Sequence, residues 1–153
     1  MPPQSAEVVQ RDSRDVRARP CGKFTVAVFA DDVSVNAPAV LDEYLRLNER
    51  KNIFLAGQIT GVEGYIESTA MGLVAGLNAS RVLDGKNLLN WPRECAIGSL
   101  LNYLHTTEPK HFQPMNMNLG IFPELKGVRG KKERAKVHRD LAIEAFKKFL
   151  EAL

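Results

Sequence analysis

Three glycines in the middle of the chain, Gly57, Gly61 and Gly64, follow an apolar run and precede a helical pattern. Glycine at such a turn lets the backbone adopt positive φ and approach a ligand closely. The helix start presents unpaired N–H groups, which suit a phosphate or an electron-rich flavin carbonyl. Gln58 adds an acceptor and donors for hydroxyl or pyrophosphate groups. The spacing predicts either a cofactor-binding turn or a plain tight turn, because the fingerprint G-x-G-x-x-G is absent.

A buried strand and a helix must position this turn. Residues 52–56 are apolar without alternation, which favours a strand buried on both faces of a parallel sheet. A helix is predicted from about 64 to 83. Its stripe of small residues implies that a sheet or a cofactor passes close to it. The stripe consists of Ser68, Gly72, Gly76 and Ala79.

The remaining elements suggest an α/β fold that is only part of a layer. One strong central strand is too few for a complete doubly wound sheet. A long helix at the C-terminal end carries an apolar stripe that recurs every four residues. The predicted elements are a strand over 24–29, a short helix from Pro38 through Leu45, an amphipathic helix over 95–105, an irregular stretch over 106–125 and a helix over 131–153.

The composition describes one globular domain of 153 residues, 44% hydrophobic and 25% charged. Its net charge of +3 is too mild to indicate nucleic acid by itself. Cys21 and Cys95 form neither a CxxC pair nor a metal-ligand pattern, so a reducing cytoplasm fits best. No apolar run approaches the roughly 18 residues that suggest a membrane span.

Basic residues gather between 126 and 139, where seven Lys or Arg accompany one acid, Glu133. Such a cluster suits an RNA phosphate backbone, with affinity that falls steeply with salt. The alternative is a solvated helix face, since no aromatic side chains interleave for base stacking. Arg93 is a further candidate, or it pairs with Glu94 or a backbone carbonyl. The candidate RNA contacts are Arg93, Lys126, Arg129, Lys131, Lys132 and Arg134.

Four blocks, in the right order, resemble signatures of the folate- and flavin-dependent tRNA uracil-5-methyltransferases. They are Ala56–Ser68, Gly72–Ala79, Pro92–Leu100 and Phe112–Pro123, with a similar lead-in at Asn36–Leu41. The resemblance runs from about residue 34 to the end. A related flavoprotein family, the large subunit of the wobble-uridine carboxymethylaminomethyl enzyme, shares the first block. That family ranks second, because it is not expected to share the last block.

The resemblance implies a C-terminal portion of an FAD-binding domain, with a partial Rossmann-like layer and a long C-terminal helix. Family members take a carbon from methylenetetrahydrofolate, use reduced FAD with electrons from NAD(P)H, and methylate a uridine in tRNA. Asn116 and Asn118 would present amides to a pterin or flavin edge, or tie down an irregular loop. By the same resemblance the flavin neighbours are Gly57, Gln58, Gly61, Val62, Glu63 and Gly64.

The chain also departs from the family. The Gly-rich βαβ unit that grips the ADP part of FAD has no counterpart, and neither do the regions that carry the family's catalytic cysteines. No catalytic residue is therefore assigned, and Cys95 is interpreted as a buried small apolar residue. Residues 1–33 do not resemble the family, so we expect a divergent or disordered lead-in followed by a unit over 34–153.

These departures predict a truncated or frame-disrupted gene product. We expect the isolated chain to bind FAD weakly or not at all, and to need a chain that supplies the missing N-terminal half. Whether it is an enzyme by itself stays open. The alternatives are a basic RNA- or protein-binding module without redox activity, and a remnant with no activity.

Overall fold

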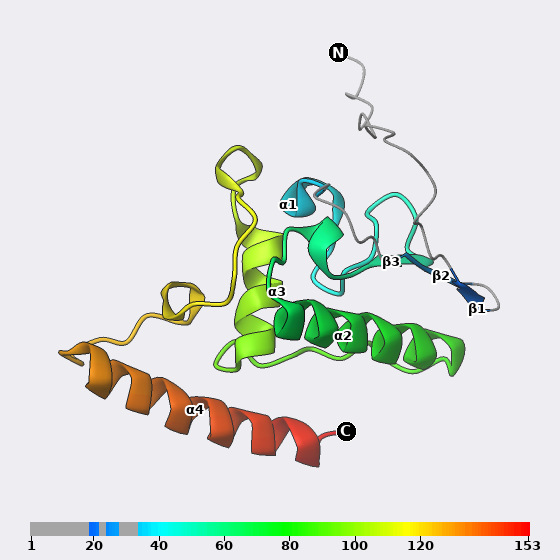
Figure 1. The fold of residues 1–153 in the computed structure, drawn as a ribbon. Helices are drawn as coiled ribbons and strands as arrows, with labels where there is room; N and C mark the ends of the chain where they lie inside the picture. Colours follow the sequence, from blue (N-terminus) through cyan, green and yellow to red (C-terminus); the bar gives the residue numbers. More distant parts are fainter. Residues whose placement is uncertain (1–18, 22–23, 28–33) are drawn as a thin grey trace.

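The computed structural model describes residues 19–21, 24–27 and 34–153, with side chains from residue 34 onward. Figure 1 shows two crossing helices at the centre, a small sheet at one side and a long helix along the bottom. The elements are β1 (Arg19–Cys21), β2 (Phe24–Ala27), α1 (Ala37–Val40), β3 (Ile53–Leu55), α2 (Tyr65–Leu83), α3 (Ala96–Thr106) and α4 (Lys131–Glu151). Short 3-10 turns lie at Gln58–Thr60, Pro109–His111 and Leu119–Ile121.

The sheet has three strands in the order β1-β2-β3. Strands β2 and β3 run parallel, with Val26 opposite Phe54, which confirms the parallel pairing expected of the apolar run. Strand β1 pairs antiparallel with β2 and was not predicted, because Arg19–Cys21 falls in a polar, charged stretch. The predicted end of the β2 strand at 28–29 lies outside the described residues, as does most of the lead-in over 1–33 that was predicted to be divergent or disordered. The described parts of that lead-in are β1 and β2.

The core forms where α2 packs against β3 and α3 packs against α1 and α2. Phe54 of β3 is fully buried at its centre. Helix α2 begins after Gly64 and ends before Asp84, close to the predicted limits. Its buried residues are Met71, Val74, Ala75, Asn78 and Ala79, and α3 buries Leu100, Leu101 and Leu104 among others. Within the described part of the chain, neither these helices nor any other is long and apolar enough to cross a membrane.

The helix predicted from Pro38 through Leu45 stops at Val40. Leu41 is already extended, and the Asp42 carboxylate accepts hydrogen bonds from the backbone N–H groups of Tyr44 and Arg46 at 3.0 and 2.9 Å. Such local side-chain hydrogen bonds compete with those of a helix. The chain therefore turns at Asp42 instead of continuing the helix.

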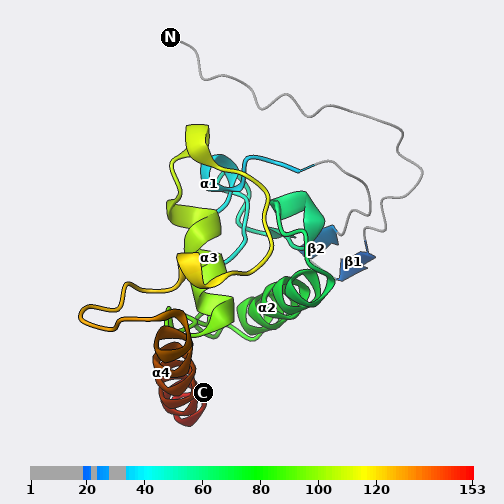
Figure 2. The same ribbon diagram turned by 60° about the vertical axis from the view of Figure 1, so that its left-hand side comes forward.

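Helix α4 packs on the rest of the chain along one side. The ring of Phe149 lies 4.9 Å from that of Trp91, centroid to centroid, and the Cys95 thiol donates to the Ala142 carbonyl at 3.4 Å. Figure 2 shows α4 below the α2–α3 unit, with its outer side free of other described elements. Several apolar side chains of its stripe therefore stay exposed: Leu141, Ile143, Phe146 and Leu150.

Candidate cofactor turn and basic surface

The turn between β3 and α2 has a backbone that only glycine adopts easily. Gly57 has φ +83° and Gly61 has φ +82°, both in the region that L side chains rarely occupy. Between them lies the 3-10 turn Gln58–Thr60, closed by a hydrogen bond from the Thr60 hydroxyl to the Gly57 carbonyl at 2.7 Å. The spacing of these glycines thus reflects a fixed turn and not loose chain.

Two of the predicted cofactor neighbours in this turn present free side chains. Gln58 is exposed although Gly57 and Ile59 on either side are buried, and its amide forms no hydrogen bond with any described residue. Glu63 is exposed in the same way. Val62 differs, because the whole residue is 0% exposed and its carbonyl accepts a hydrogen bond from the Ser68 hydroxyl at 3.0 Å. Val62 therefore offers neither its side chain nor its backbone to a ligand in this structure.

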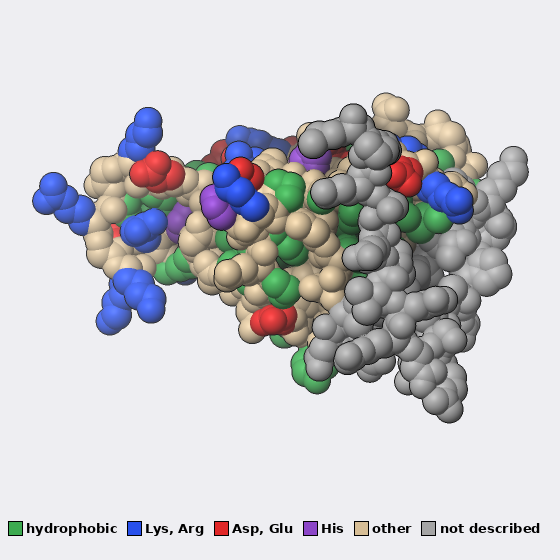
Figure 3. Space-filling view, turned by 90° about the horizontal axis from the view of Figure 1, so that it is seen from above, with side chains coloured by type: hydrophobic (Ala, Val, Ile, Leu, Met, Phe, Trp, Pro, Cys, Tyr) green, Lys and Arg blue, Asp and Glu red, His purple; other side chains and the backbone are tan. Residues whose placement is uncertain are grey.

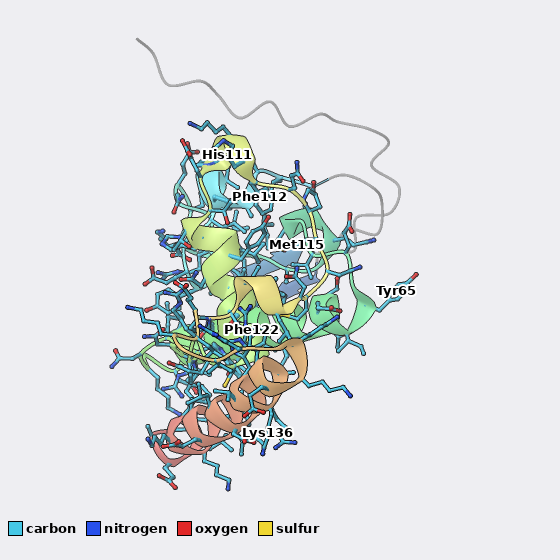
Figure 4. All side chains as sticks on the ribbon, turned by 90° about the vertical axis from the view of Figure 1, so that its left-hand side faces the viewer. Tyr65, His111, Phe112, Met115, Phe122 and Lys136 are labelled. Atoms are coloured by element: carbon cyan, nitrogen blue, oxygen red, sulfur yellow. The ribbon has the colours of Figure 1, made fainter. Side chains whose placement is uncertain are left out.

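The structure brings the loop 112–117 against the glycine turn, although some 50 residues of sequence separate them. The Met115 N–H donates to the Gly61 carbonyl at 3.0 Å, and the Glu63 N–H donates to the Met115 carbonyl at 3.2 Å. A Cβ atom on Gly61 would come within 2.6 Å of the Phe112 ring. Figure 4 shows Phe112 and Met115 on this loop, beside the turn. The sequence predicted that both segments lie near one ligand, but not that Phe112 fits the space left by Gly61.

The amino end of α2 is partly occupied by a side chain of its own. The Glu67 carboxylate folds back over Gly64, and it accepts a hydrogen bond from the Met117 N–H at 3.2 Å. Residues 56–80 contain no Lys or Arg. This segment itself supplies no cation to offset the carboxylate, so by its own groups it suits a neutral carbonyl better than a phosphate. Glu67 thus has the structural role that acids in a first helical turn often have.

The two candidate amides differ in their surroundings. Asn118 accepts from the Gly120 N–H at 2.8 Å and donates to the Asn116 carbonyl at 3.2 Å, so its side chain ties the loop together. The side chain of Asn116 is exposed and forms no hydrogen bond with a described residue. Of the two, Asn116 is the amide that remains free for a ligand.

Helix α2 leaves one face open. Tyr65 and Ile66 at its start are 90% and 83% exposed, and Figure 4 shows Tyr65 pointing away from the rest of the molecule. No described atom lies within 4 Å of the Cβ position of Gly72 or Gly76. The close neighbour that the small residues predict is therefore not another described part of this chain. Further apolar residues of α2 are exposed as well: Leu73, Leu77 and Leu83.

The basic cluster lies on the loop before α4 and on the first turns of that helix, where Figure 3 shows Lys and Arg side chains standing out from the surface. Arg139 pairs with Asp140 at 2.8 Å. The other six form no ion pair with any described residue, and they are Lys126, Arg129, Lys131, Lys132, Arg134 and Lys136. Arg93 is exposed, and neither Glu94 nor a described carbonyl pairs with its guanidinium.

Cys95 is buried beside α4, which confirms the interpretation of a small core residue. Burial raises the pKa of its thiol, and the neighbouring charge of Glu94 raises it further. A thiol that stays protonated is a poor nucleophile. Within the described residues no cluster of His, Cys, Asp and Glu is suited to hold a metal ion.

The glycine turn and α2 fall in the part of the chain that matches a known family profile. The family described as glucose inhibited division protein A matches residues 21–87, which is less than half of the chain. The match includes β3, the turn and the whole of α2, and it stops before α3 and α4.

The chain is also similar to proteins named methylenetetrahydrofolate--tRNA-(uracil-5-)-methyltransferase TrmFO. The protein of Lysinibacillus sphaericus is 50% identical over 117 residues, 76% of this chain and 27% of its own length. That of Desulforudis audaxviator is 51% identical over 112 residues, covering 72% and 26%. That of Listeria monocytogenes is 48% identical over 120 residues, covering 78% and 28%. The resemblance predicted from the four blocks is confirmed, and the chain spans about a quarter of the length of these relatives.

Two solved structures of Aquifex aeolicus GidA are also similar. The form I crystal gives a TM-score of 0.46 at 26% identity, over 78% of this chain and 20% of that one. The form II crystal gives 0.42 at 23% identity, over 75% and 20%. TM-scores below 0.5 do not establish a common fold.

Proposed function

We propose that this chain forms the flavin-side portion of the FAD-binding domain of a tRNA uracil-5-methyltransferase that takes its carbon from methylenetetrahydrofolate. The observation that carries the proposal is the rigid turn from Gly57 to Gly64 with the loop 112–117 fastened to it. Both segments belong to the blocks that resemble the methyltransferases. Relatives with that name are about 50% identical to this chain.

The turn would contribute backbone groups and the Gln58 amide to the cofactor. Gly57 and Gly61 let the chain pass close to a flat ring system, and Gln58 is free to donate and accept. The proposed flavin neighbours are Gly57, Gln58, Gly61, Val62, Glu63, Gly64 and Asn116. Asn118 would act indirectly, because its side chain stabilises the loop that carries Asn116. FAD, when bound, would supply the reducing electrons that NAD(P)H delivers.

The pyrophosphate of FAD would be held by a different part of the complete site. Residues 56–80 provide no cation, and the Glu67 carboxylate already lies at the amino end of α2. A second polypeptide segment, equivalent to the Gly-rich βαβ unit of the family, would have to supply the contacts to the pyrophosphate. The open face of α2 is where the rest of a Rossmann-like layer would pack, because Gly72 and Gly76 allow a sheet to come close.

We further propose that residues 34–153 form the unit that belongs to this domain, and that tRNA contacts it through the basic surface. The proposed RNA contacts are Arg93, Lys126, Arg129, Lys131, Lys132 and Arg134. Six cations of this surface lack acidic partners in the described chain, so a phosphate backbone would gain ion pairs without breaking any.

A second candidate is a basic RNA-binding module without redox chemistry. The same unpaired cations favour it, and it requires no flavin. The wobble-uridine family is less favoured. Relatives that are about 50% identical over about three quarters of this chain carry the methyltransferase name.

The proposal is tested by a chimera. The segment of the Lysinibacillus sphaericus methyltransferase that matches this chain is replaced by the corresponding residues of this chain, and the chimera is expressed in a strain that lacks its own enzyme. We expect 5-methyluridine to return to the tRNA, as measured by mass spectrometry of its nucleosides. A chimera that folds and accumulates but leaves the tRNA unmethylated would reject the proposal. The unaltered relative serves as the control.

A further inference from the structure

A hollow of about 320 Å³ lies where the 3-10 turn at 119–121 meets the start of α4. No carboxylate is among the residues that line it. Its three polar side chains stand at positions i, i+3 and i+7 of α4, so they share one face of the helix. The lining residues are Leu119, Gly120, Gly130, Lys131, Arg134 and His138.

His138 is the buried polar group of this hollow. Its side chain is only 4% exposed, and its ring packs against Phe122 with centroids 5.2 Å apart. No hydrogen bond or ion pair reaches the imidazole from any residue that the structure describes. Among the described residues, the fully buried side-chain nitrogens that lack a partner are Asn78 Nδ2 and Trp91 Nε1, so the His138 nitrogens keep some contact with solvent. Because His138 lines the hollow, a ligand there can reach its imidazole.

Two of the other lining side chains are cationic. Lys131 and Arg134 are exposed and have no acidic partner in the described part of the chain. Helix α4 begins at Lys131, and its cap residue Gly130 has no side chain to accept from the first N–H groups. These N–H groups and the helix dipole attract an anion. Two cations, the start of a helix and an imidazole thus border one hollow.

We propose that this hollow binds a phosphate group. Lys131 and Arg134 are its counter-ions, the first N–H groups of α4 are donors, and the His138 imidazole is a third side-chain donor. The inference rests on the RNA part of the proposed function, in which the phosphate is one diester of an RNA backbone. Free phosphate is the other source of the same chemistry.

The test is an NMR titration of the full 153-residue chain with inorganic phosphate at constant ionic strength, with chloride as the reference anion. The His138 imidazole and the Lys131 and Lys132 amides are followed. We expect a saturable shift with phosphate and none with chloride. The double variant Lys131→Gln with Arg134→Gln should weaken the apparent affinity about tenfold, the size of one charge-assisted hydrogen bond.

The matched control is the double variant Lys136→Gln with Lys147→Gln. It removes the same charge from exposed positions of the same helix that do not line the hollow. We expect less than a twofold change in phosphate affinity. A non-saturable response of the natural chain, or an equal loss in both double variants, would overturn the inference.

His138→Phe tests the buried group separately. Phe keeps a ring against Phe122 and removes both nitrogen atoms. We expect the phosphate affinity to fall at least threefold while the thermal midpoint is kept or raised. If affinity were unchanged in a folded His138→Phe, the imidazole would not be a ligand and that part of the inference would be wrong. The double variant Lys131→Gln with Arg134→Gln and its control change only exposed side chains. They therefore test the hollow even if His138→Phe does not fold.

A short single-stranded RNA separates the two sources of phosphate and also separates this inference from the proposed function. Displacement of inorganic phosphate by the RNA supports a backbone diester in the hollow. Saturable phosphate binding without competition by RNA supports the hollow and counts against RNA as its ligand. A third outcome is that phosphate does not bind saturably and that RNA binds the Lys131→Gln, Arg134→Gln variant as tightly as the natural chain. That outcome overturns this inference and leaves the RNA proposal standing.

Discussion

The Glu67 carboxylate accepts a hydrogen bond from the Met117 backbone N–H at 3.2 Å and so joins the first turn of α2 to a loop 50 residues further along the chain. The same carboxylate lies over Gly64. This contact adds to the two backbone hydrogen bonds of Met115 that hold the loop 112–117 against the glycine turn. The spacing between these two segments defines the space in which we place the flavin edge.

Glu67→Ala should loosen this arrangement. It removes an acceptor from a part-buried N–H and an acid from a helix start, so we expect a loss of about 1–2 kcal/mol in the free energy of unfolding. Urea denaturation measures the loss, and amide exchange at Met117 should become faster. Glu63→Ala is the control, since it removes an exposed acid nearby, and it should change stability by less than about 0.5 kcal/mol. Equal losses would contradict the fastening role.

Gly61→Ala tests the contact between the turn and Phe112. Gly61 and Gly127 have similar positive φ, +82° and +78°, so Ala at either position carries a comparable backbone strain of about 1–2 kcal/mol. Only at Gly61 would the new Cβ meet an aromatic ring; at Gly127 no described atom lies within 4 Å. We expect Gly61→Ala to cost about 1–3 kcal/mol more in unfolding free energy. Equal costs for the two variants would mean that Phe112 moves aside freely.

Gly98→Ala should destabilise the protein although alanine favours a helix. A Cβ atom there would overlap the Pro92 carbonyl and lie 2.8 Å from the Trp91 carbonyl, and backbone atoms do not move easily. Gly76→Ala on α2 meets only open space, so it should stabilise the isolated chain by about 0.5–1 kcal/mol. Thermal unfolding should therefore move in opposite directions for the two variants. A rise in both midpoints would refute the packing assigned to Gly98.

Asp42→Asn should remove a contribution to stability that depends on pH. Burial raises the pKa of Asp42, but hydrogen bonds from the Arg46 and Tyr44 N–H groups and from Lys51, with the Arg46 charge, together hold it below its ordinary 3.8. A carboxyl whose pKa is lower in the folded state than in the unfolded state stabilises the fold at pH values above its unfolded pKa. This stabilisation is lost as the pH falls through the pKa of the folded state.

The free energies of unfolding of the natural chain and Asp42→Asn should therefore differ by a constant amount above about pH 5 and converge below pH 3.8. Urea denaturation at a series of pH values measures the difference. The exposed pair of Asp84 and Lys86 offers a control, because Asp84→Asn removes a solvent-screened charge and should have little effect at any pH. A difference for Asp42→Asn that grows as pH falls would have the wrong sign for this account.

The long periodic elements were predictable from the sequence because their signals are local. Helix α2 follows from its glycine start and its Asp84–Gly85 end, and α4 from a repeating apolar stripe. Helix α1 was overestimated, since the pattern through Leu45 did not show that the Asp42 side chain bonds its own backbone. Strand β1 was missed because Arg19–Cys21, which contains an Arg and a Pro, lacks the β-branched and aromatic residues that indicate a strand.

The site was predictable only in outline. The blocks placed the glycine turn and the 112–123 stretch near one ligand, and the hydrogen bonds of Met115 with Gly61 and Glu63 fit that expectation. The position of the Glu67 carboxylate over Gly64 depends on a side-chain rotamer, which residue spacing does not reveal. The basic cluster over 126–139 did not single out His138. Its burial depends on tertiary packing against Phe122, which the local sequence does not show.

The flavin content of the chimera with the Lysinibacillus sphaericus methyltransferase tests the central claim most directly. We expect it to purify with about one FAD per chain by visible absorbance, and Gln58→Ala in the chimera to lower that content. We expect the isolated 153-residue chain to bind FAD weakly, because it provides only one side of the site. A folded chimera without flavin, or stoichiometric and tight FAD on the isolated chain, would contradict the account.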